Sequence, residues 1–346
     1  MNRSAFDFDR PGALQATAPP EDRGVERDEV RLLVTDAAGS RHRTFRSLPD
    51  LLEPGDLLVV NESATLAASL PARGGGFDFL LNVSTDYGRN LWLAETRWSP
   101  SRPGPVPLRP GDRITVAEIS FRAVGPFPGI ERLWFFRGVG DVAATMQEWG
   151  RPIRYGYVTR PYSLDTYQTV FSRVPGSAEM PSAGRPFTPR VVRALSDRGV
   201  GIAPVVLHAG VSSLETEPDR ADIPPIYPEP FEVPGATAER INETHRTGHR
   251  VIAVGTTVLR ALETAWTAGG VVPLRGFTQL TLGPGRPMRS VEGMLTGLHD
   301  PRTSHLALLF GFAGEERIRA AYAVAVRGRY LWHEFGDSHL VWAAGQ

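Results

Sequence analysis

The sequence contains no cysteine. This absence excludes disulfides, thiolate nucleophiles, Fe–S clusters and zinc sites built on cysteine, and we expect the protein to work in a reducing, cytoplasmic environment. Lysine is absent as well, which excludes Schiff-base chemistry on a lysine side chain. The 38 basic residues, all arginine, are balanced by 38 acidic ones, so an overall basic nucleic-acid coat is excluded, whereas a local basic patch is not.

Long apolar runs are also missing. Residues 6–9 carry acids where a signal peptide needs an apolar core, and no later run approaches the roughly 18 apolar residues of a membrane helix. We therefore expect neither secretion nor membrane insertion. What is present is typical of globular proteins, with 41% hydrophobic and 22% charged residues in a chain of 346, a length suited to two domains.

The chain divides into two parts by its secondary-structure pattern. Residues 1–68 and 151–346 mix strands with helices, whereas residues 69–150 are β-patterned, with a proline-rich loop at 99–107 and one helix, Val142–Trp149. Strands are expected at 31–35, 56–60, 77–83, 91–96, 113–124 and 132–136. The sequence therefore predicts a mixed-sheet α/β domain made of 1–68 and 151–346, into which 69–150 insert an antiparallel β-barrel domain.

Helices and strands alternate after residue 151. Thr188 and Pro189 predict the start of a helix over 189–198, and Gly199 ends it before the strand 200–207. Pro204 within that strand indicates an edge or a bulge. Further helices are expected at 236–247 and 258–268, on either side of a strand at 250–254.

A glycine turn leads into the last of these helices. Gly255, Thr256 and Thr257 follow the buried strand and precede a helix that contains Arg260 and Glu263. Free N–H groups and the positive end of the helix dipole suit a carboxylate or a phosphate. From spacing alone an ordinary strand-to-helix turn with a threonine cap is the favoured interpretation, because glycine and threonine are common at such turns.

The loop 181–188 is rich in small residues and precedes a helix. Gly184 would let a ligand approach the backbone, and Phe187 could stack on a base. The alternative is that the small residues serve only tight packing.

Two histidines lie where a site could form. His208 ends a predicted strand, and ligands of open α/β sheets gather outside the carboxyl ends of strands. His299 precedes a turn, where Asp300 could orient its ring. His245 and His249 have the spacing of a helical metal pair, but the helix is expected to end between them and no metal is expected.

A basic face could form beside the loop 181–188, where four arginines are suitably spaced: Arg185, Arg190, Arg193 and Arg198. Such a face could touch the phosphates of a nucleic acid. The alternative is a helix face that is simply solvated.

Several segments, taken in order, resemble one known family. They lie at 6–8, 27–28, 31–34, 54–59, 167–170, 175–176, 183–184, 187–188, 207–210, 250–263, 295–296, 299, 312–314 and 336–337. Among them are Tyr167-Gln168 and Gly336-Asp337. In these motifs the chain resembles the S-adenosylmethionine:tRNA ribosyltransferase-isomerases of queuosine synthesis, over nearly all of its length outside the β-patterned insert.

The resemblance implies a fold and a reaction. The family combines an α/β domain with an inserted β-barrel. Its enzymes move the ribosyl unit of S-adenosylmethionine onto the aminomethyl group of a 7-deazaguanine in tRNA, rearrange it, and release adenine and methionine. Matching positions imply that catalytic groups come from His208, His299, Glu263 and Asp337. They imply that S-adenosylmethionine is held by Tyr167, Gln168, Gly184, Phe187, Gly255, Thr256, Thr257 and Arg260.

Several segments depart from the family pattern, at 61–63, 185–186, 211–214, 226–229, 297–298 and 301–302. Where the family has Leu-His, this chain has Arg185-Pro186, so a histidine is lost. Changed loops on a retained scaffold are typical of altered substrates. Besides the tRNA reaction, two alternatives therefore stand: S-adenosylmethionine chemistry on a small molecule without tRNA, or a non-catalytic nucleoside-binding protein. The acceptor and the oligomeric state do not follow from the sequence.

Overall fold

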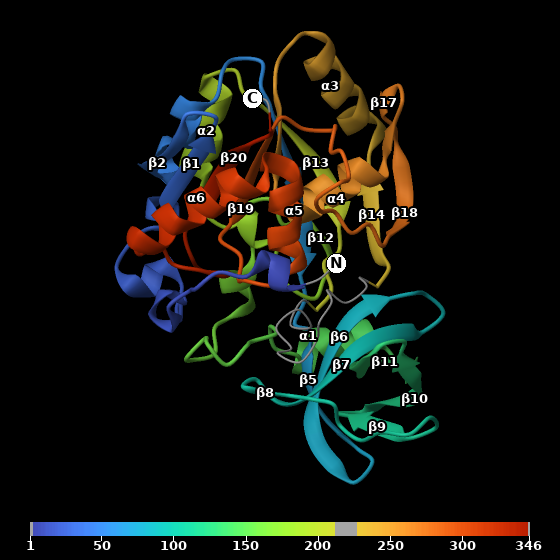
Figure 1. Ribbon diagram of the computed structural model, residues 1–346. Helices are drawn as coiled ribbons and strands as arrows, with labels where there is room; N and C mark the ends of the chain where they lie inside the picture. Colours follow the sequence, from blue (N-terminus) through green and yellow to red (C-terminus); the bar gives the residue numbers. More distant parts are fainter. Residues whose placement is uncertain (1–2, 212–226, 345–346) are drawn as a thin grey trace.

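A computed structural model describes residues 3–211 and 227–344 (Figure 1). Its centre is a mixed nine-stranded sheet in which β13, β3, β15 and β19 run parallel, while β20 and β1 run the other way. In sheet order the strands are β18 (Leu274–Thr278), β14 (Glu229–Val233), β13 (Gly201–Leu207), β3 (Leu57–Asn61), β15 (Val251–Val254), β19 (Gly293–Gly297), β20 (Ser338–Trp342), β1 (Arg31–Asp36) and β2 (Gly39–Thr44).

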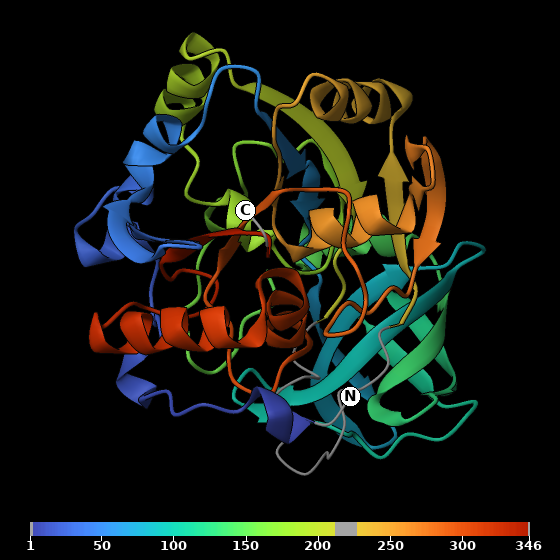
Figure 2. The ribbon, with the colours of Figure 1, turned by 45° about the horizontal axis from the view of Figure 1, so that its top comes forward.

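Helices cover both faces of this sheet. Because successive strand residues point to opposite faces, Leu57 and Val59 join one hydrophobic core, and Leu58 and Val60 join another. The first core is covered by α3 (Gly235–Arg246), α4 (Thr256–Thr264), α5 (Ser304–Ala313) and α6 (Glu315–Arg327). The second is covered by α2 (Pro189–Asp197) and the 3-10 helix η5 (Phe45–Leu51). Figure 2 shows α5 and α6 together on one side of the sheet.

The predicted barrel is present at one end of the α/β part (Figures 1 and 2). Its strands are β5 (Ser69–Gly74), β6 (Phe77–Asp86), β7 (Leu91–Ser99), β9 (Arg113–Val116), β10 (Ile119–Phe127) and β11 (Ile130–Val139), and pairing of β11 with β7 closes it. The predicted fold class, an α/β domain with an antiparallel barrel, is thereby confirmed.

The barrel core extends beyond the inserted segment. Ala178, Val211 and Tyr227, which belong to the α/β part of the sequence, pack in the same hydrophobic cluster as the barrel strands. The helix α1 (Val142–Trp149) has the predicted bounds and packs Val142 and Met146 into the barrel core, with the Asp141 carboxylate accepting a hydrogen bond from Ala144 N. Within the described residues, no helix is both long and apolar enough to span a bilayer.

Two predicted elements differ from the structure. The single strand expected at 113–124 is a hairpin of β9 and β10, because the chain turns at Ala117, where φ is 46°. The helix expected at 258–268 ends at Thr264. The chain then forms a small hairpin of β16 (Trp266–Thr267) and β17 (Gly270–Val271), since a two-residue loop containing glycine favours that turn.

Other local predictions are confirmed. The Thr188 hydroxyl accepts a hydrogen bond from Val191 N at the start of α2. Pro204 lies where β13 pairs only with β3, because β14 joins β13 only at Val206 and Leu207. Proline is tolerated there because no ladder bond needs its missing N–H.

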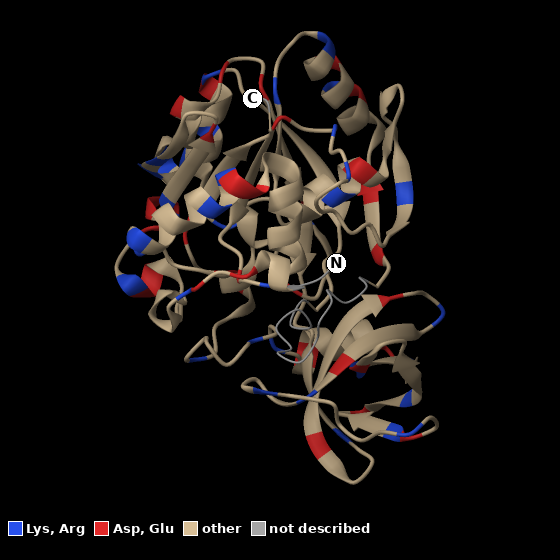
Figure 3. Cartoon of the chain, viewed as in Figure 1, with Lys and Arg blue, Asp and Glu red and all other residues tan. Residues whose placement is uncertain are grey.

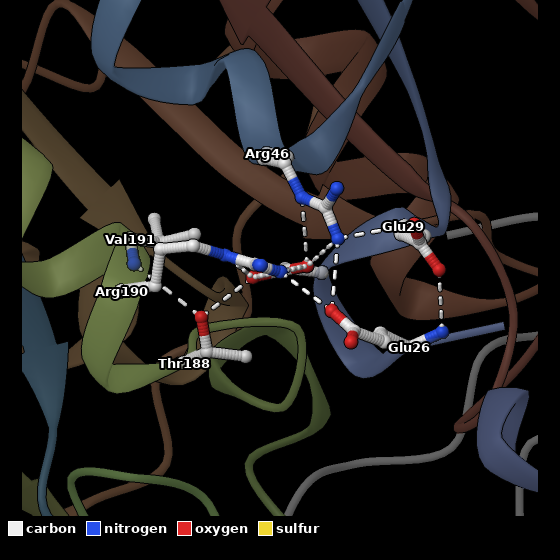
Figure 4. Close-up of polar contacts among 7 residues, drawn as sticks. Glu26, Glu29, Arg46, Thr188, Arg190 and Val191 are labelled. Atoms are coloured by element: carbon white, nitrogen blue, oxygen red, sulfur yellow. Dashed lines mark hydrogen bonds and ion pairs between the residues drawn. The ribbon is translucent and has the colours of Figure 1, made fainter.

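A polar cluster ties the N-terminal segment to the second helical layer (Figure 4). Asp28, in the short 3-10 helix η4 (Arg27–Glu29), is 0% exposed. Its carboxylate accepts hydrogen bonds from Thr188 Oγ1 at 2.6 Å, Arg190 Nη2 at 2.6 Å and Arg46 Nε at 3.2 Å. Burial alone would raise the pKa of Asp28, but these hydrogen bonds hold it below its ordinary value.

We expect Asp28→Asn to lower the free energy of unfolding by about 1–3 kcal/mol at neutral pH, since charged hydrogen bonds are lost. The loss stays modest because the guanidinium groups of Arg46 and Arg190 are 41% and 50% exposed and water can solvate them. Because the folded pKa of Asp28 is depressed, its contribution is present above the unfolded pKa of about 3.9 and is lost as the pH falls through the folded value.

Urea denaturation at pH 7 and pH 3 measures this effect. Asp197→Asn, an exposed position at the end of α2, is the matched control and should change stability by less than about 0.5 kcal/mol. Equal stabilities of Asp28→Asn and the wild type at pH 7 would contradict the assignment.

Candidate active site

A cavity of about 220 Å³ lies outside the carboxyl ends of the parallel strands, the usual place for ligands in such sheets. Segments following β12 (Val174–Ser177), β13, β15 and β19, and the segment before β20, form its walls. Its polar and charged lining groups include Glu179, Ser182, Tyr227, Glu229, Thr256, Thr257, Arg260, Thr281, Thr296, His299, Asp300, Thr303, Ser304, His305, His333 and Glu334.

The start of α4 forms one wall. Gly255 has φ of 102°, a backbone conformation that favours glycine, and an added Cβ would lie 3.4 Å from the Ala183 side chain. Gly255, Thr256 and Thr257 all line the cavity. The first turn of α4 therefore brings backbone N–H donors and the positive end of its dipole to this wall.

Arg260 extends the same wall from the second turn of α4. Its Nη1 donates to the Glu229 carboxylate and its Nε donates to Leu280 O at 2.9 Å. The other Glu229 oxygen accepts from Gly210 N at 2.8 Å, which fixes the pair between two segments. Nη2 of Arg260 is buried and has no hydrogen-bond partner in the part of the chain that the structure describes. This guanidinium thus keeps a donor for a further acceptor.

His299 also lines the cavity, after β19, the strand next to β15. Its Nε2 is 2.8 Å from Thr296 Oγ1, and its ring stacks on His305 with centroids 4.9 Å apart and an angle of 13°. Burial, together with the neighbouring histidines His305, His333 and His339, lowers the pKa of His299 well below its ordinary value, so the ring is neutral at pH 7. The hydroxyl of Thr296, rather than the carboxylate of Asp300 that the sequence suggested, contacts this ring nitrogen.

Two carboxyl side chains complete the lining. Glu179 follows β12 and accepts a hydrogen bond from the Tyr155 hydroxyl. Glu334 precedes β20 and is hydrogen-bonded to Tyr157, whose hydroxyl also lies 2.8 Å from His333 Nδ1. Burial, reinforced by the nearby Glu179, raises the pKa of Glu334 to about 8.

His208 lies behind the cavity wall rather than among its lining residues. It directly follows β13, as expected, and its Nδ1 is 2.7 Å from the Ser63 hydroxyl. Its ring also covers Gly176, where a Cβ would come within 2.4 Å of it. Burial lowers the pKa of His208.

Glu263 and Asp337 are held by structural contacts outside the cavity lining. One oxygen of Glu263 accepts from the backbone N–H groups of Arg289 and Ser290 and from the Ser290 hydroxyl, at 2.7–2.8 Å. Asp337 forms an ion pair with Arg31 and accepts from Leu331 N at 2.7 Å. Asp337 also lines a small neighbouring pocket that shares His333 and Glu334 with the main cavity.

Four residues expected at the cofactor lie further back. Phe187 is 1% exposed and packs edge-on against Phe45 and Phe171, so its ring belongs to the core and is enclosed by it. The Tyr167 ring packs against Phe335.

The other two fasten loops together. The Gln168 amide bonds the backbone of Thr65 in both directions, at 2.8 and 3.0 Å. Gly184 faces Thr169 and Phe171, and its neighbours Ser182 and Ala183 reach the cavity instead.

The expected basic face needs a correction. Arg185 is 2% exposed, because its guanidinium is paired with Glu21 and lies 4.9 Å over the Phe335 ring. A buried side chain cannot belong to a surface patch. Figure 3 shows acidic and basic residues interspersed over both parts of the molecule.

Among the residues at 3–211 and 227–344, no group of three or more His, Asp or Glu side chains is arranged to hold a metal ion. His245 packs edge-on against Trp266 and lies 3.4 Å from Glu292.

Sequence reasoning missed several lining residues: Glu179, Tyr227, Glu229, His305, His333 and Glu334. The signal for some was present, since Glu179 lies two residues after a short strand and His305 begins a helix next to the predicted His299. Nothing local distinguishes Glu334 or Tyr227 from ordinary loop residues.

Comparisons with known proteins agree over the whole chain. The sequence profile of the family described as queuosine biosynthesis protein matches residues 3–341. An S-adenosylmethionine:tRNA ribosyltransferase-isomerase of Rubrobacter xylanophilus is 38% identical over 354 residues, covering 100% of this chain and 99% of its own. The protein of the same name from Thermus thermophilus is 35% identical over 343 residues, covering 93% and 96% of the two chains.

A solved structure is similar to this chain over nearly its whole length. The crystal structure of S-adenosylmethionine tRNA ribosyltransferase from Thermotoga maritima superposes with a TM-score of 0.55 at 28% sequence identity. The match covers 97% of this chain and 99% of that one.

Proposed function

The chain belongs to the S-adenosylmethionine:tRNA ribosyltransferase-isomerase family of queuosine biosynthesis, and on that premise we propose that it catalyses this family's reaction. In this reaction the ribosyl unit of S-adenosylmethionine is transferred to a 7-deazaguanine of tRNA and isomerised, and adenine and methionine are released. S-adenosylmethionine is thus a substrate that is consumed, and tRNA is the acceptor.

The observation that carries the proposal is the wall formed by α4. S-adenosylmethionine has a carboxylate on its methionine part, and the N–H groups of Thr256 and Thr257 together with the unpartnered Nη2 of Arg260 provide donors for one. The N–H of Gly255 already donates to Leu295 O at 2.8 Å, so Gly255 contributes only its backbone conformation to this wall. Glu229 holds Arg260 in place from the other side. We assign Thr256, Thr257 and Arg260 to the methionine carboxylate.

A base is needed for the proton beside the sulfonium centre. We assign this role to His299, because it lines the cavity and its imidazole is neutral at pH 7. Its lowered pKa makes it a weak base, and the adjacent sulfonium acidifies the proton that it must accept. The contacts of His208, Glu263 and Asp337 favour positioning roles, with His208 holding the loop at Ser63 and Gly176.

For the acceptor we propose tRNA in the cytosol, bound next to the cavity. Of the predicted arginine face, Arg190, Arg193 and Arg198 remain exposed on or just after α2. Arg190 is partly neutralised by Asp28 and Glu26, so the salt dependence of RNA binding should be weak.

The test is incubation of the purified protein with S-adenosylmethionine, with and without tRNA that carries the aminomethyl-deazaguanine. Adenine and methionine are followed by mass spectrometry. We expect equimolar release that requires the modified tRNA. Turnover without tRNA would overturn the tRNA assignment in favour of a small-molecule reaction, and no release in either condition would leave a nucleoside-binding protein.

A further inference from the structure

Glu179 and Glu334 bring two carboxyl groups to one end of the cavity. They come from segments far apart in the sequence, one after β12 and one before β20, and both line the cavity. The two carboxyl groups interact electrostatically: burial raises the pKa of Glu334, and the negative charge of the nearby Glu179 raises it further. Two adjacent acids in a partly closed site repel each other when both are ionised.

Tyrosine hydroxyls support the pair from behind. Tyr155 donates to Glu179, and Tyr157 is hydrogen-bonded to Glu334. The two tyrosine rings stack with centroids 6.1 Å apart, which fixes both hydroxyls. These neutral donors satisfy part of each carboxyl group without neutralising its charge.

One oxygen of the pair has no partner. Oε2 of Glu334 is buried, and across residues 3–211 and 227–344 nothing donates a hydrogen bond to it. Tyr157, Tyr167, Glu179 and Arg185 are the titratable groups that influence Glu334 or are influenced by it. Among them the one cation is Arg185, and its guanidinium is hydrogen-bonded elsewhere.

The contacts of Arg185 show why it leaves Glu334 incomplete. Its Nη2 donates to both Glu21 oxygens at 3.1 Å and its Nε donates to Thr166 O at 3.1 Å. A buried carboxyl group with an open acceptor and a second acid beside it suits a small cationic donor.

We propose that Glu334, with Glu179 beside it, binds the primary ammonium group of a substrate. The inference rests on the proposed function, in which two substrates carry such a group: the methionine part of S-adenosylmethionine and the aminomethyl group of the acceptor base. The recognised chemistry is the same in both cases, and the experiment distinguishes the two sources.

Binding should release a proton. With its pKa near 8, Glu334 is mostly protonated at pH 7 before the ligand arrives. An ammonium group stabilises the carboxylate and lowers that pKa, so the carboxyl proton passes to solvent as the ion pair forms. A residue with a purely structural role would give no such release.

The first arm measures binding of S-adenosylmethionine and of its deaminated analogue by calorimetry at pH 7, in buffers of different ionisation enthalpy. If the ammonium comes from S-adenosylmethionine, the wild type should bind it about 10–100-fold more tightly than the analogue and release a proton. Glu334→Gln should lose both the preference and the proton release. Glu316→Gln, exposed on α6, is the control that should keep both.

The second arm measures kcat and KM for an RNA hairpin bearing the aminomethyl base and for one bearing a hydroxymethyl base. If Glu334→Gln retains its preference for S-adenosylmethionine but loses its preference for the aminomethyl base, the ammonium is that of the acceptor. Glu179→Gln should weaken the same ligand preference that Glu334→Gln loses. Thermal unfolding checks that both variants fold.

The proposal is overturned if Glu334→Gln keeps every preference that the wild type shows, or if the wild type shows none in either arm. The calorimetric comparison needs no turnover. A wild type that discriminates between the ligands but releases no adenine would therefore refute the proposed function and leave the ammonium site standing.

Discussion

Replacing Glu95 by alanine should lower the free energy of unfolding by about 3–5 kcal/mol, the usual cost of leaving buried charges unpaired. Glu95 lies on β7 and is fully buried, and its Oε1 is 3.0 Å from Arg97 Nη1 and 3.1 Å from Arg132 Nε. The side chains are 0%, 6% and 4% exposed, so neither arginine reaches water when the carboxylate is removed. Denaturation in guanidinium chloride, followed by tryptophan fluorescence, gives the difference.

Two further variants sharpen this experiment. Glu131→Ala, exposed on the neighbouring strand β11, should change stability by no more than about 0.5 kcal/mol. The triple variant Glu95→Leu, Arg97→Met, Arg132→Met removes all three charges together and should be more stable than Glu95→Ala. If Glu95→Ala stays within about 1 kcal/mol of the wild type, the ion cluster is not a buried network.

The second large effect concerns ligand affinity. Arg260→Lys should raise the Kd for S-adenosylmethionine by roughly 10–100-fold, the loss expected for one charged hydrogen bond. Lysine still provides a positive charge to pair with Glu229, so the fold should survive. Its single ammonium group cannot also replace the second guanidinium nitrogen, the unpartnered Nη2, which would bind the ligand. Isothermal titration calorimetry on the wild type and the variant measures the change.

A decarboxylated analogue of S-adenosylmethionine provides the control ligand. If Arg260 binds the carboxylate, the variant and the wild type should bind this analogue equally. Arg319→Lys, exposed on α6 in an ion pair with Glu315, should leave both affinities unchanged. An equal loss of affinity for both ligands would mean that Arg260 acts through the shape of the cavity and not on the carboxylate.

Much of the fold could be predicted from the sequence because its signals are local. The cap at Thr188, the strand at β15 and the helix α1 depend on neighbouring residues, and the structure has them within a residue or two of the predicted bounds. The errors arose where a tight turn outweighed a hydrophobic pattern. The left-handed turn at Ala117 splits a strand, and the hairpin at Trp266 shortens a helix.

The site was less predictable, because it is assembled by contacts between distant segments. Gly255, Thr256, Thr257, Arg260 and His299 line the cavity, and all five lie directly beyond a parallel strand, in a strand-to-helix turn, an early helix turn or a loop. Such positions can be identified from the order of elements.

The predicted site residues that do not line the cavity are held away from it by contacts with other residues. Asp337 is bound by Arg31, and Phe187 is enclosed by Phe45 and Phe171; both partners come from segments far away in the chain. Glu334 reaches the cavity only because the start of β20 lies beside the end of β19. No spacing within a single segment contains that information.

The sharing of the barrel core carries a consequence for engineering and for evolution. Ala178, Val211 and Tyr227 complete the hydrophobic interior of the barrel from outside the inserted segment, and Val211 and Tyr227 also line the cavity. A barrel excised at its strand boundaries would expose apolar side chains of its own core, and the cavity-lining residues Val211 and Tyr227, which stay behind in the α/β part, would lose their packing partners. The insert is therefore not an exchangeable module, and any recombined protein must inherit these three residues together with the barrel.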